Sequence, residues 1–272
     1  MQESPSVWTR LIATVLLGTA GMAWAAPACP DKPISFAFFE SGLLYSESTH
    51  DGIDKAVMEE LARRSKCTFD FSVKPRARIW LELERGDLMM TGSAIRTEER
   101  DAYAWGVNYF GLKAELMLRS VNGNHPRSKE EFLKDESLKI GVARAFKHGE
   151  AMDSFIEELR QRNRVVDVPP SSMYDMFSRN RFAAMPIYPL DSVYRDKREV
   201  SQFNMAADWF PTDRSVPRAL LFSKKHFTKA QVQEWRVLVQ QMKDDGTLKK
   251  IFTHYAGKDS AEKLMQFAPD AP

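Results

Sequence analysis

The sequence predicts an α/β fold built from two successive units in which strands alternate with helices. Residues 34–73 contain a short apolar run, then apolar residues at helical spacing, then residues that alternate between apolar and polar. Residues 138–168 repeat this order of strand, helix and strand. Because a helix that connects two strands allows them to pair in parallel, we expect two mostly parallel sheets flanked by helices.

The first unit contains a well-defined helix, because Ile53, Val57 and Leu61 recur at the spacing of one helix face. Residues 68–73 then switch to the period of two that is typical of a half-buried strand. A second, shorter helix is expected to end at Gly86. The predicted elements, in order, are strand 34–39, helix 53–61, strand 68–73, helix 79–83 and strand 88–91.

The second unit and the C-terminal part follow the same rules. Ser171 or Ser172 can cap a short helix, since both are residues that accept hydrogen bonds at helix starts. The clearest helix begins at Thr228 and is expected to end before Gly246, which suits a left-handed C-terminal cap. The other predicted elements are strand 138–142, helix 152–159, strand 165–168, helix 173–177 and strand 182–188.

The N-terminal segment has the pattern of a secretory signal peptide. An apolar stretch at residues 11–25 follows Arg10 and ends in the small-x-small sequence of residues 23–25. A membrane anchor is the alternative, but spanning needs about 20 predominantly apolar residues, and this run is shorter. Lipid attachment at Cys29 is a further alternative, although residues 26–28 lack the leucine usual before such a cysteine.

Composition and the scarce cysteines exclude several classes of protein. The chain has 272 residues and a formal net charge of +2 with no long basic run, so a nucleic-acid partner is not expected. Export to an oxidising compartment permits a disulfide between Cys29 and Cys67, the only two cysteines. Two cysteines and five scattered histidines do not form a zinc pattern, so neither a metal nor another cofactor is predicted.

Three segments together resemble a known family. These are Gly52-Ile53-Asp54 before the first helix, the stretch GDLMMTGSAIRTEER at residues 86–100, and the stretch WRVLVQQMKDDGTLKKIFTHY at residues 235–255. In order and spacing they are similar to motifs of the bacterial extracellular solute-binding proteins of family 3, the polar amino acid type that serves ABC importers. The resemblance covers nearly the whole chain after the signal peptide.

The resemblance implies a two-lobed periplasmic-binding-protein fold of type II, joined by two hinge strands near residues 114–120 and 216–223. It also implies a periplasmic monomer that closes on a small polar solute, an amino acid or related carboxylate, and passes it to an ABC permease. No chemistry is expected. The implied divisions are a signal peptide at 1–25, lobe 1 at 26–118, lobe 2 at 119–217 and the return to lobe 1 at 218–272.

Arg100 is the most informative single residue of the predicted site. The family's Thr-x-x-Arg motif, here Thr97 to Arg100, implies that this guanidinium grips a ligand carboxylate through paired charge-assisted hydrogen bonds. A surface arginine paired with a neighbouring acid is the alternative. Ser93 matches a position that contacts ligand in relatives. The alternative is that it is only a hydroxyl at the end of a strand, without a role in binding.

Aromatic and charged residues complete the predicted site. Tyr45 and Trp80 are candidate cleft walls, and Glu40 is a candidate partner for a ligand cation. The alternative roles are a loop anchor for Tyr45, a core ring for Trp80 and a solvated acid for Glu40. In lobe 2, Ala145 and Phe146 stand where the family has Gly-Ser/Thr, and Lys147 follows; Phe146 and Lys147 are candidate site residues. Tyr188 replaces the aspartate that commonly binds an α-ammonium, with Asp191 slightly beyond.

These departures weaken the case for an ordinary α-amino acid as ligand. If Lys147, Arg144 and Arg100 all face the cleft, they favour a ligand with more than one negative group, such as a dicarboxylate. Solvated side chains are the alternative for the first two. Two other functions stay open: a periplasmic dehydratase with Glu40 as the acid, and a subunit that senses a ligand for a membrane receptor.

Overall fold

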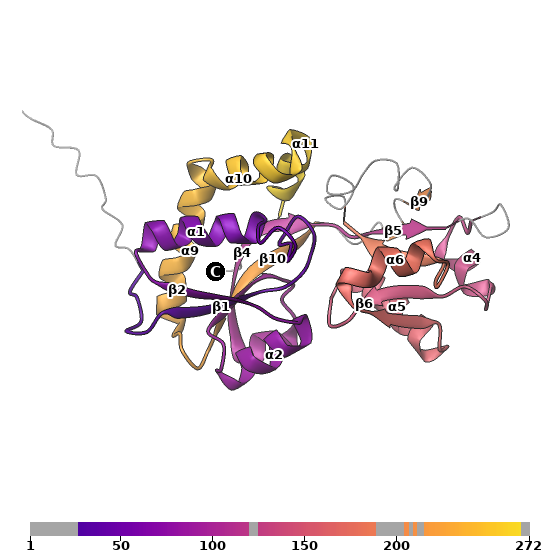
Figure 1. Ribbon diagram of the computed structural model, residues 1–272, viewed down its shortest axis with the longest axis horizontal. Helices are drawn as coiled ribbons and strands as arrows, with labels where there is room; N and C mark the ends of the chain where they lie inside the picture. The colour runs from indigo at the N-terminus through magenta and orange to yellow at the C-terminus, as the bar shows by residue number, and fades with distance from the viewer. Residues whose placement is uncertain (1–26, 120–124, 189–203, 207–208, 211–214, 268–272) are drawn as a thin grey trace, which may run out of the picture.

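The protein consists of two lobes that lie side by side, each built on its own five-stranded sheet (Figure 1). The structure is a computed structural model that describes residues 27–119, 125–188, 204–206, 209–210 and 215–267. The predicted signal peptide, residues 1–25, lies outside the described residues. Within the described part of the chain, no helix is long and apolar enough to cross a membrane.

Both ends of the described chain belong to lobe 1, whose sheet has the order β2-β1-β3-β10-β4. Strand β1 pairs in parallel with β2 and β3, and β10 is antiparallel to β3 and β4. The elements of this lobe are β1 Ile34–Phe38, α1 Ile53–Ser65, β2 Phe69–Val73, α2 Arg76–Arg85, β3 Met90–Ala94, α3 Glu98–Tyr103, β4 Ala104–Leu112, β10 Val216–Ser223, α9 Lys229–Asp244, α10 Thr247–Ala256 and α11 Lys258–Leu264.

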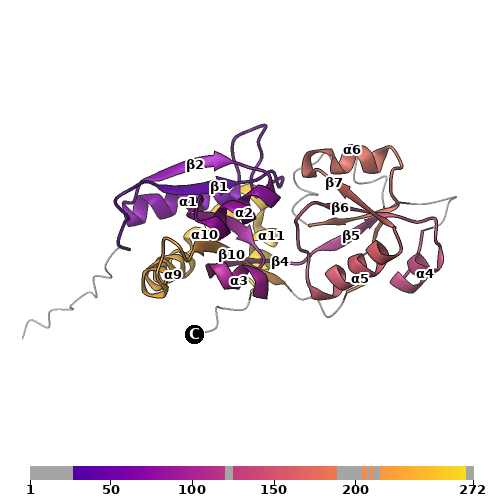
Figure 2. The same ribbon diagram turned by 90° about the horizontal axis from the view of Figure 1, so that it is seen from below.

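Lobe 2 is built from the middle of the chain, and its sheet has the order β7-β6-β8-β5-β9. Figure 2 shows α5 and α6 on opposite sides of this sheet. The elements are β5 Glu115–Leu118, α4 Lys129–Lys134, β6 Ile140–Ala143, α5 Glu150–Gln161, β7 Val165–Val168, a 3-10 turn Pro170–Ser172, α6 Met173–Ser178, β8 Ala184–Ile187 and β9 Asn204–Ala206.

The chain crosses between the lobes slightly earlier than the sequence predicted. Strand β5 pairs with β8 and β9 of the second sheet, although its residues were assigned to the lobe 1 range 26–118. Strand β10 pairs with β4 from Val216 onward, two positions before the predicted return at 218. Hydrogen-bond register decides these crossings, and an apolar strand that suits either sheet does not reveal its partner in the sequence.

Helix ends were predicted well where a cap determines them. Thr228 caps α9 by accepting a hydrogen bond from Gln231 N–H, and Gly246 follows the helix with the left-handed φ of 77°. Ser172 precedes α6, but its side chain makes no capping hydrogen bond, so this part of the predicted cap is wrong. Strand β3 begins two residues later than predicted, at Met90.

Each lobe has its own apolar core on both faces of its sheet. In lobe 1, helices α1, α9, α10 and α11 pack on one face around the fully buried Trp235, and α2 packs on the other through Ile79 and Leu83. In lobe 2, α5 covers one face and α6 the other, where Phe177 is fully buried. Two separate cores allow the lobes to move as units about the chain crossings.

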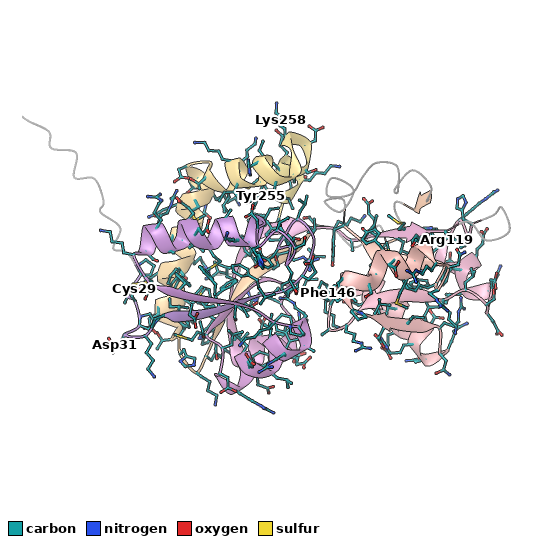
Figure 3. All side chains as sticks on the ribbon, in the orientation of Figure 1. Cys29, Asp31, Arg119, Phe146, Tyr255 and Lys258 are labelled. Atoms are coloured by element: carbon teal, nitrogen blue, oxygen red, sulfur yellow. A yellow bond between two sulfur atoms is a disulfide. The ribbon has the colours of Figure 1, made fainter. Side chains whose placement is uncertain are left out.

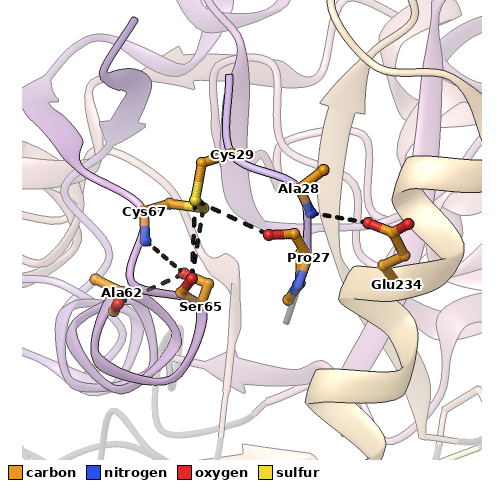
Figure 4. The surroundings of a disulfide bond; sticks show 7 residues. All are labelled: Pro27, Ala28, Cys29, Ala62, Ser65, Cys67 and Glu234. Atoms are coloured by element: carbon orange, nitrogen blue, oxygen red, sulfur yellow. Dashed lines mark hydrogen bonds between the residues drawn. A yellow bond between two sulfur atoms is a disulfide. The ribbon is translucent and has the colours of Figure 1, made fainter. Parts of the chain in front are cut away.

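The predicted disulfide between Cys29 and Cys67 is confirmed, with the two Cα atoms 5.3 Å apart (Figure 4). It joins the segment before β1 to the residues that follow α1. Beside it, the Ala28 N–H donates a hydrogen bond to Glu234 Oε2 of α9 at 2.9 Å. The covalent link therefore holds the N-terminal segment on lobe 1, far from the lobe boundary.

Candidate functional site

The candidate site is a cavity at the boundary of the lobes, where a loop of lobe 2 reaches lobe 1. Phe146 lies at this boundary (Figure 3) and packs against the lobe 1 core, its ring 5.4 Å from the ring of Phe39. The Ala145 carbonyl accepts hydrogen bonds from Trp80 Nε1 at 3.3 Å and from Arg100 Nη2 at 3.5 Å. These contacts describe a closed arrangement in which both lobes line one cavity.

The cavity is narrow: its empty volume is about 310 Å³ when space open to solvent is counted, but only about 20 Å³ of it admits the centre of a water-sized sphere. Two wider hollows of about 1050 Å³ and 900 Å³, counted with their open space, adjoin it, so a solute of several atoms would extend from the cavity into them. Lobe 1, including β10, provides most of the wall, and the loop after β6 and the end of β8 provide the rest. The lining residues are Phe39, Ser41, Leu44, Arg76, Ser93, Ile95, Arg100, Ala145, Phe146, Lys147, Tyr188 and Arg218.

Arg76, the first residue of α2, is buried in the cavity wall and was missed by sequence reasoning. Its guanidinium donates to the carbonyls of Gly92 and Ser93 at 3.1 and 3.0 Å, and its Cζ lies 3.7 Å from the Phe39 ring centroid. Burial holds the pKa of Arg76 well below its ordinary value, and the nearby charge of Arg100 adds to this effect. In the sequence, the signal that could have identified Arg76 was its position four residues before Trp80, a predicted wall residue.

Arg100 lies in the cavity wall, where the sequence predicted it. Thr97 caps α3 by accepting a hydrogen bond from Arg100 N–H, and the guanidinium donates to the Ile95 carbonyl at 2.7 Å. Its Cζ lies 3.9 Å from the ring centroid of Trp80, which also contacts the Arg76 guanidinium at 4.1 Å. Trp80 therefore supports both arginines through cation–π contacts and does not itself line the central cavity.

Arg218 is a third buried arginine in the wall, and sequence reasoning missed it as well. It lies in β10 with 3% of its surface exposed, and its Cζ is 5.1 Å from the Tyr188 ring centroid. Its Nη2 is buried without a hydrogen-bond partner among the residues that the structure describes. An arginine within the otherwise apolar run of residues 216–222 was a signal that could have identified it.

Ser93 lines the cavity, but its hydroxyl is engaged in a buried network. It donates to Asp54 Oδ1 at 2.9 Å, and Asp54 also accepts a hydrogen bond from the Tyr109 hydroxyl. Burial raises the pKa of Asp54 to about 6, although these hydrogen bonds and the charge of Arg76 lower it. Asp54, the acid of the Gly-Ile-Asp motif, therefore lies behind the cavity wall and holds the Ser93 side chain in place.

Tyr188 lines the cavity on the side of lobe 2, and His148 lies behind it against an adjoining hollow. The Tyr188 hydroxyl lies 3.1 Å from His148 Nδ1 and donates to the Lys147 carbonyl at 3.2 Å. His148 is buried, and burial together with the charges of Arg218 and Lys147 lowers its pKa to about 3. Its Nε2 has no partner among the described residues, and its ring faces the adjoining 1050 Å³ hollow.

Glu40 and Tyr45, both predicted for the site, have structural roles in their loop. Tyr45 is buried in the lobe 1 core, stacked on Phe38 with ring centroids 4.5 Å apart, and does not line the cavity. Glu40 accepts hydrogen bonds from the backbone N–H groups of Gly42 and Glu47 at 3.1 and 2.7 Å. It borders the adjoining hollows and not the central cavity.

The cavity wall is strongly positive. Arg76, Arg100 and Arg218 are buried there and Lys147 lies at the exposed rim, whereas the lining residues include no aspartate or glutamate. Arg144, predicted to act with Lys147, is exposed and borders an adjoining hollow. No group of three described His, Cys, Asp or Glu residues is placed to hold a metal ion. The chemistry offered is recognition of an anion.

Comparison with known proteins gives the fold. No protein-family model matches the chain, and neither does any curated protein sequence. Among solved structures, the arginine-, lysine-, histidine-binding protein ArtJ of Geobacillus stearothermophilus superposes with a TM-score of 0.68 at 13% identity, over 85% of this chain and 100% of its own.

Two further structures agree with this result. A putative L-cystine ABC transporter from Listeria monocytogenes has a TM-score of 0.67 at 18% identity, over 84% of this chain and 97% of its own. An ancestral amino acid-binding protein, described as a precursor of cyclohexadienyl dehydratase, has a TM-score of 0.66 at 13% identity, over 82% and 94% of the two chains. The chain thus has the predicted two-lobed α/β fold of type II periplasmic binding proteins.

Proposed function

We propose that the protein is a periplasmic solute-binding protein of the family 3 type, which closes on a small carboxylate-bearing solute and delivers it to an ABC permease. The observation that carries the proposal is the buried Arg100 guanidinium in the wall of a cavity enclosed by both lobes. A guanidinium in a water-poor cavity binds a carboxylate strongly, because water competes weakly there and the planar fork matches both oxygens.

Contacts between the lobes support a binding cycle of opening and closing. The Ala145 carbonyl of lobe 2 meets Arg100 and Trp80 of lobe 1, and Phe146 covers Phe39 beside the cavity. Few polar contacts of this kind hold two lobes with separate cores, so a bound solute that touches both would favour the closed state. The solved structures with this fold include proteins described as amino acid-binding and as belonging to ABC transporters.

Binding without chemistry is the simplest activity for this site. Glu40, the candidate acid of a dehydratase, accepts hydrogen bonds from two backbone N–H groups and borders only the adjoining hollows. The carboxyl of Asp54 is engaged by Ser93 and Tyr109 behind the wall. The cavity itself presents cations and apolar rings, which bind and orient an anion but do not supply a carboxyl acid or base.

The test is a ligand screen on the mature protein after unfolding, dialysis and refolding, because such a protein can retain its solute through purification. Thermal unfolding is measured with amino acids, mono- and dicarboxylates, polyamines and aromatic acids, since a ligand specific for the folded state raises the melting temperature. We expect a carboxylate to raise it and to be recovered unchanged by mass spectrometry. Conversion of the ligand would establish an enzyme, and stabilisation by polyamines alone would refute carboxylate binding.

Delivery to a permease and processing of the N-terminus need separate measurements. Expression with the complete N-terminus should yield a periplasmic protein that begins after Ala25, which mass spectrometry of the intact chain would show. Uptake of the identified solute should be lost in cells lacking the protein. A protein that stays membrane-bound or is needed only for a transcriptional response would contradict the transport role.

A further inference from the structure

We infer that the solute is a small dicarboxylate, with Arg100 binding one carboxylate and Arg218, assisted by His148 and Tyr188, binding the second. The inference rests on the proposed function and specifies its ligand. Nothing in the sequence motifs pointed to Arg218, because it lies in β10, outside the segments that resemble the family.

The cavity wall carries an excess of buried positive charge. Three buried guanidinium groups face one small space, and the described lining residues bring no acid to balance them. Burying an unpaired charge costs several kcal/mol, and like charges at short range add repulsion. One carboxylate would leave this excess largely in place, whereas two would neutralise most of it.

The three arginines differ in how their hydrogen-bond donors are used. Arg76 donates to the Gly92 and Ser93 carbonyls and is covered by Phe39 and Trp80, so it stiffens the wall. Arg100 gives one Nη to the Ile95 carbonyl, and its other contact, to Ala145, is long at 3.5 Å. Arg218 keeps a buried Nη2 with no described partner, so it retains the most unused capacity for an acceptor.

Lobe 2 adds a second unsatisfied buried group, His148 Nε2, near Arg218. The Tyr188 ring packs on the Arg218 guanidinium, and its hydroxyl contacts His148 Nδ1. His148 Nε2 has no described partner, and the imidazole is 4% exposed. Two buried polar groups without partners, one from each lobe, are what an acceptor of the ligand would satisfy on closure.

The residues that line the cavity offer no carboxylate to an ammonium group. Asp54 accepts from Ser93 and Tyr109 behind the wall, and Glu40 accepts from two backbone N–H groups of its own loop. Tyr188 contributes a neutral hydroxyl on the lobe 2 side, and this hydroxyl donates to the Lys147 carbonyl. An α-ammonium would therefore approach three guanidinium groups without an opposite charge, which disfavours amino acids relative to plain dicarboxylates.

The experiment compares ligands that differ by one group. Isothermal titration of the refolded protein uses glutarate, pentanoate and glutamate, and then succinate, butyrate and aspartate. In each set the second compound lacks one carboxylate, and the third adds an α-ammonium. We expect one dicarboxylate to bind at least tenfold more tightly than both of its analogues, as loss of a buried charged contact costs about 1.4 kcal/mol or more.

Arg218→Gln is the decisive variant, and Arg144→Gln, at an exposed arginine bordering an adjoining hollow, is its matched control. Arg218→Gln should weaken dicarboxylate binding on the order of 30-fold and leave monocarboxylate binding nearly unchanged, because only the second subsite is lost. The melting temperature of the ligand-free variant should equal or exceed that of the wild type, since an unpaired buried charge is removed. Arg218→Lys keeps the charge without the planar fork, so its dicarboxylate affinity should lie between those of the wild type and Arg218→Gln.

Each outcome separates this inference from the proposed function. Equal affinities for glutarate, pentanoate and glutamate, or a preference for the amino acid, would overturn the dicarboxylate but keep a carboxylate-binding protein. An unchanged ratio of dicarboxylate to monocarboxylate affinity in Arg218→Gln would remove Arg218 from the site. Failure of every mono-, di- and amino-carboxylate to bind would overturn the proposed function and this inference together.

Discussion

The two lobes contribute different kinds of groups to the cavity. Lobe 1 contributes charge through Arg76, Arg100 and Arg218, whose guanidinium groups are buried and held in place by neighbouring carbonyls or rings. Lobe 2 contributes one loop with the Ala145 carbonyl and the Phe146 ring, together with Tyr188, whose hydroxyl contacts His148 behind it. Under the proposed function, we therefore expect lobe 1 to bind the anion before closure, and lobe 2 to enclose it and contact its far end.

Removing the main cation of lobe 1 should have the largest effect on binding. Arg100→Gln should weaken carboxylate affinity by about 3 kcal/mol, or about 100-fold, because a buried charge-assisted pair loses its cation. Arg96→Gln is the matched control, since Arg96 is exposed and paired with Asp101 at 2.9 Å. Isothermal titration would measure both variants, and an intact affinity in Arg100→Gln would show that lobe 1 holds the anion elsewhere.

The buried ionisable groups of the two lobes should respond to acid in opposite directions. Asp54 in lobe 1 has a pKa of about 6 against an ordinary 3.8, so below pH 6 the folded state takes up its proton before the unfolded chain does. Its contribution therefore raises the free energy of unfolding as pH falls from 7 to 4.5. The gain is about 2 kcal/mol at 1.36 kcal/mol per pKa unit.

His148 in lobe 2 acts in the opposite sense. Its pKa is about 3 in the folded state against an ordinary 6.5, because it is buried and faces Arg218 and Lys147. Its backbone N–H donates to Asp153 and its ring contacts the Tyr188 hydroxyl. Below pH 6.5 the unfolded chain binds the proton and the folded state does not, so stability falls by about 2.5 kcal/mol between pH 7 and 4.5.

Urea unfolding of the ligand-free protein at pH 7 and pH 4.5 would check both signs. Relative to the wild type, Asp54→Asn should lose stability on acidification, because it lacks the gain from Asp54. His148→Gln should gain stability relative to the wild type, because it lacks the loss from His148. Equal pH dependence in the wild type and both variants would mean that neither group is as strongly buried as described.

A smaller effect is expected where lobe 2 covers the ligand. Phe146→Ala should weaken binding about tenfold, because the ring that closes on Phe39 and Arg76 is lost. The melting temperature of the ligand-free protein should change little, since Phe146 is only half-buried. Leu81→Ala, at an exposed position of α2, is the control. Equal affinity for Phe146→Ala and the wild type would exclude a closing role for this loop.

The smallest effect should come from the backbone of the same loop. Ala145 has a left-handed φ of 61°, a conformation that costs a residue with a Cβ about 1 kcal/mol and costs glycine almost nothing. Ala145→Gly should therefore raise the free energy of unfolding by up to about 1 kcal/mol in a urea titration. Ala143→Gly, within β6, should lower it instead. Destabilisation by both variants would show that the contacts of the Ala145 Cβ stabilise the loop by more than its left-handed backbone strains it.

The site was predicted only in part from the sequence. Arg100 and Ser93 were found because a local motif places them, and Phe146, Lys147 and Tyr188 because they depart from one; all five line the cavity. Tyr45 and Trp80 were assigned to the wall on residue type, but Tyr45 packs in the core and Trp80 supports two arginines. Residue type alone does not tell which side of a loop or helix faces ligand.

Arg76 and Arg218 were missed because no local pattern distinguishes a buried arginine from a solvated one. Arg76 is buried because the Gly92 and Ser93 carbonyls from β3 accept its donors. Arg218 is buried because β10 pairs between β3 and β4 and Tyr188 arrives from the other lobe. These partners are distant in sequence, so only the folded chain brings them together.

The sequence by itself determined the local elements, the two α/β units, the caps at Thr228 and Gly246, and the pairing of Cys29 with Cys67. Short-range periodicity and steric preferences decide the elements and caps, and two cysteines allow only one intramolecular pairing. The tertiary structure alone decided the strand order, the crossings between lobes and the gathering of three arginines around one cavity. The physical reason is that register and burial depend on contacts between distant segments, whose energies exceed local preferences.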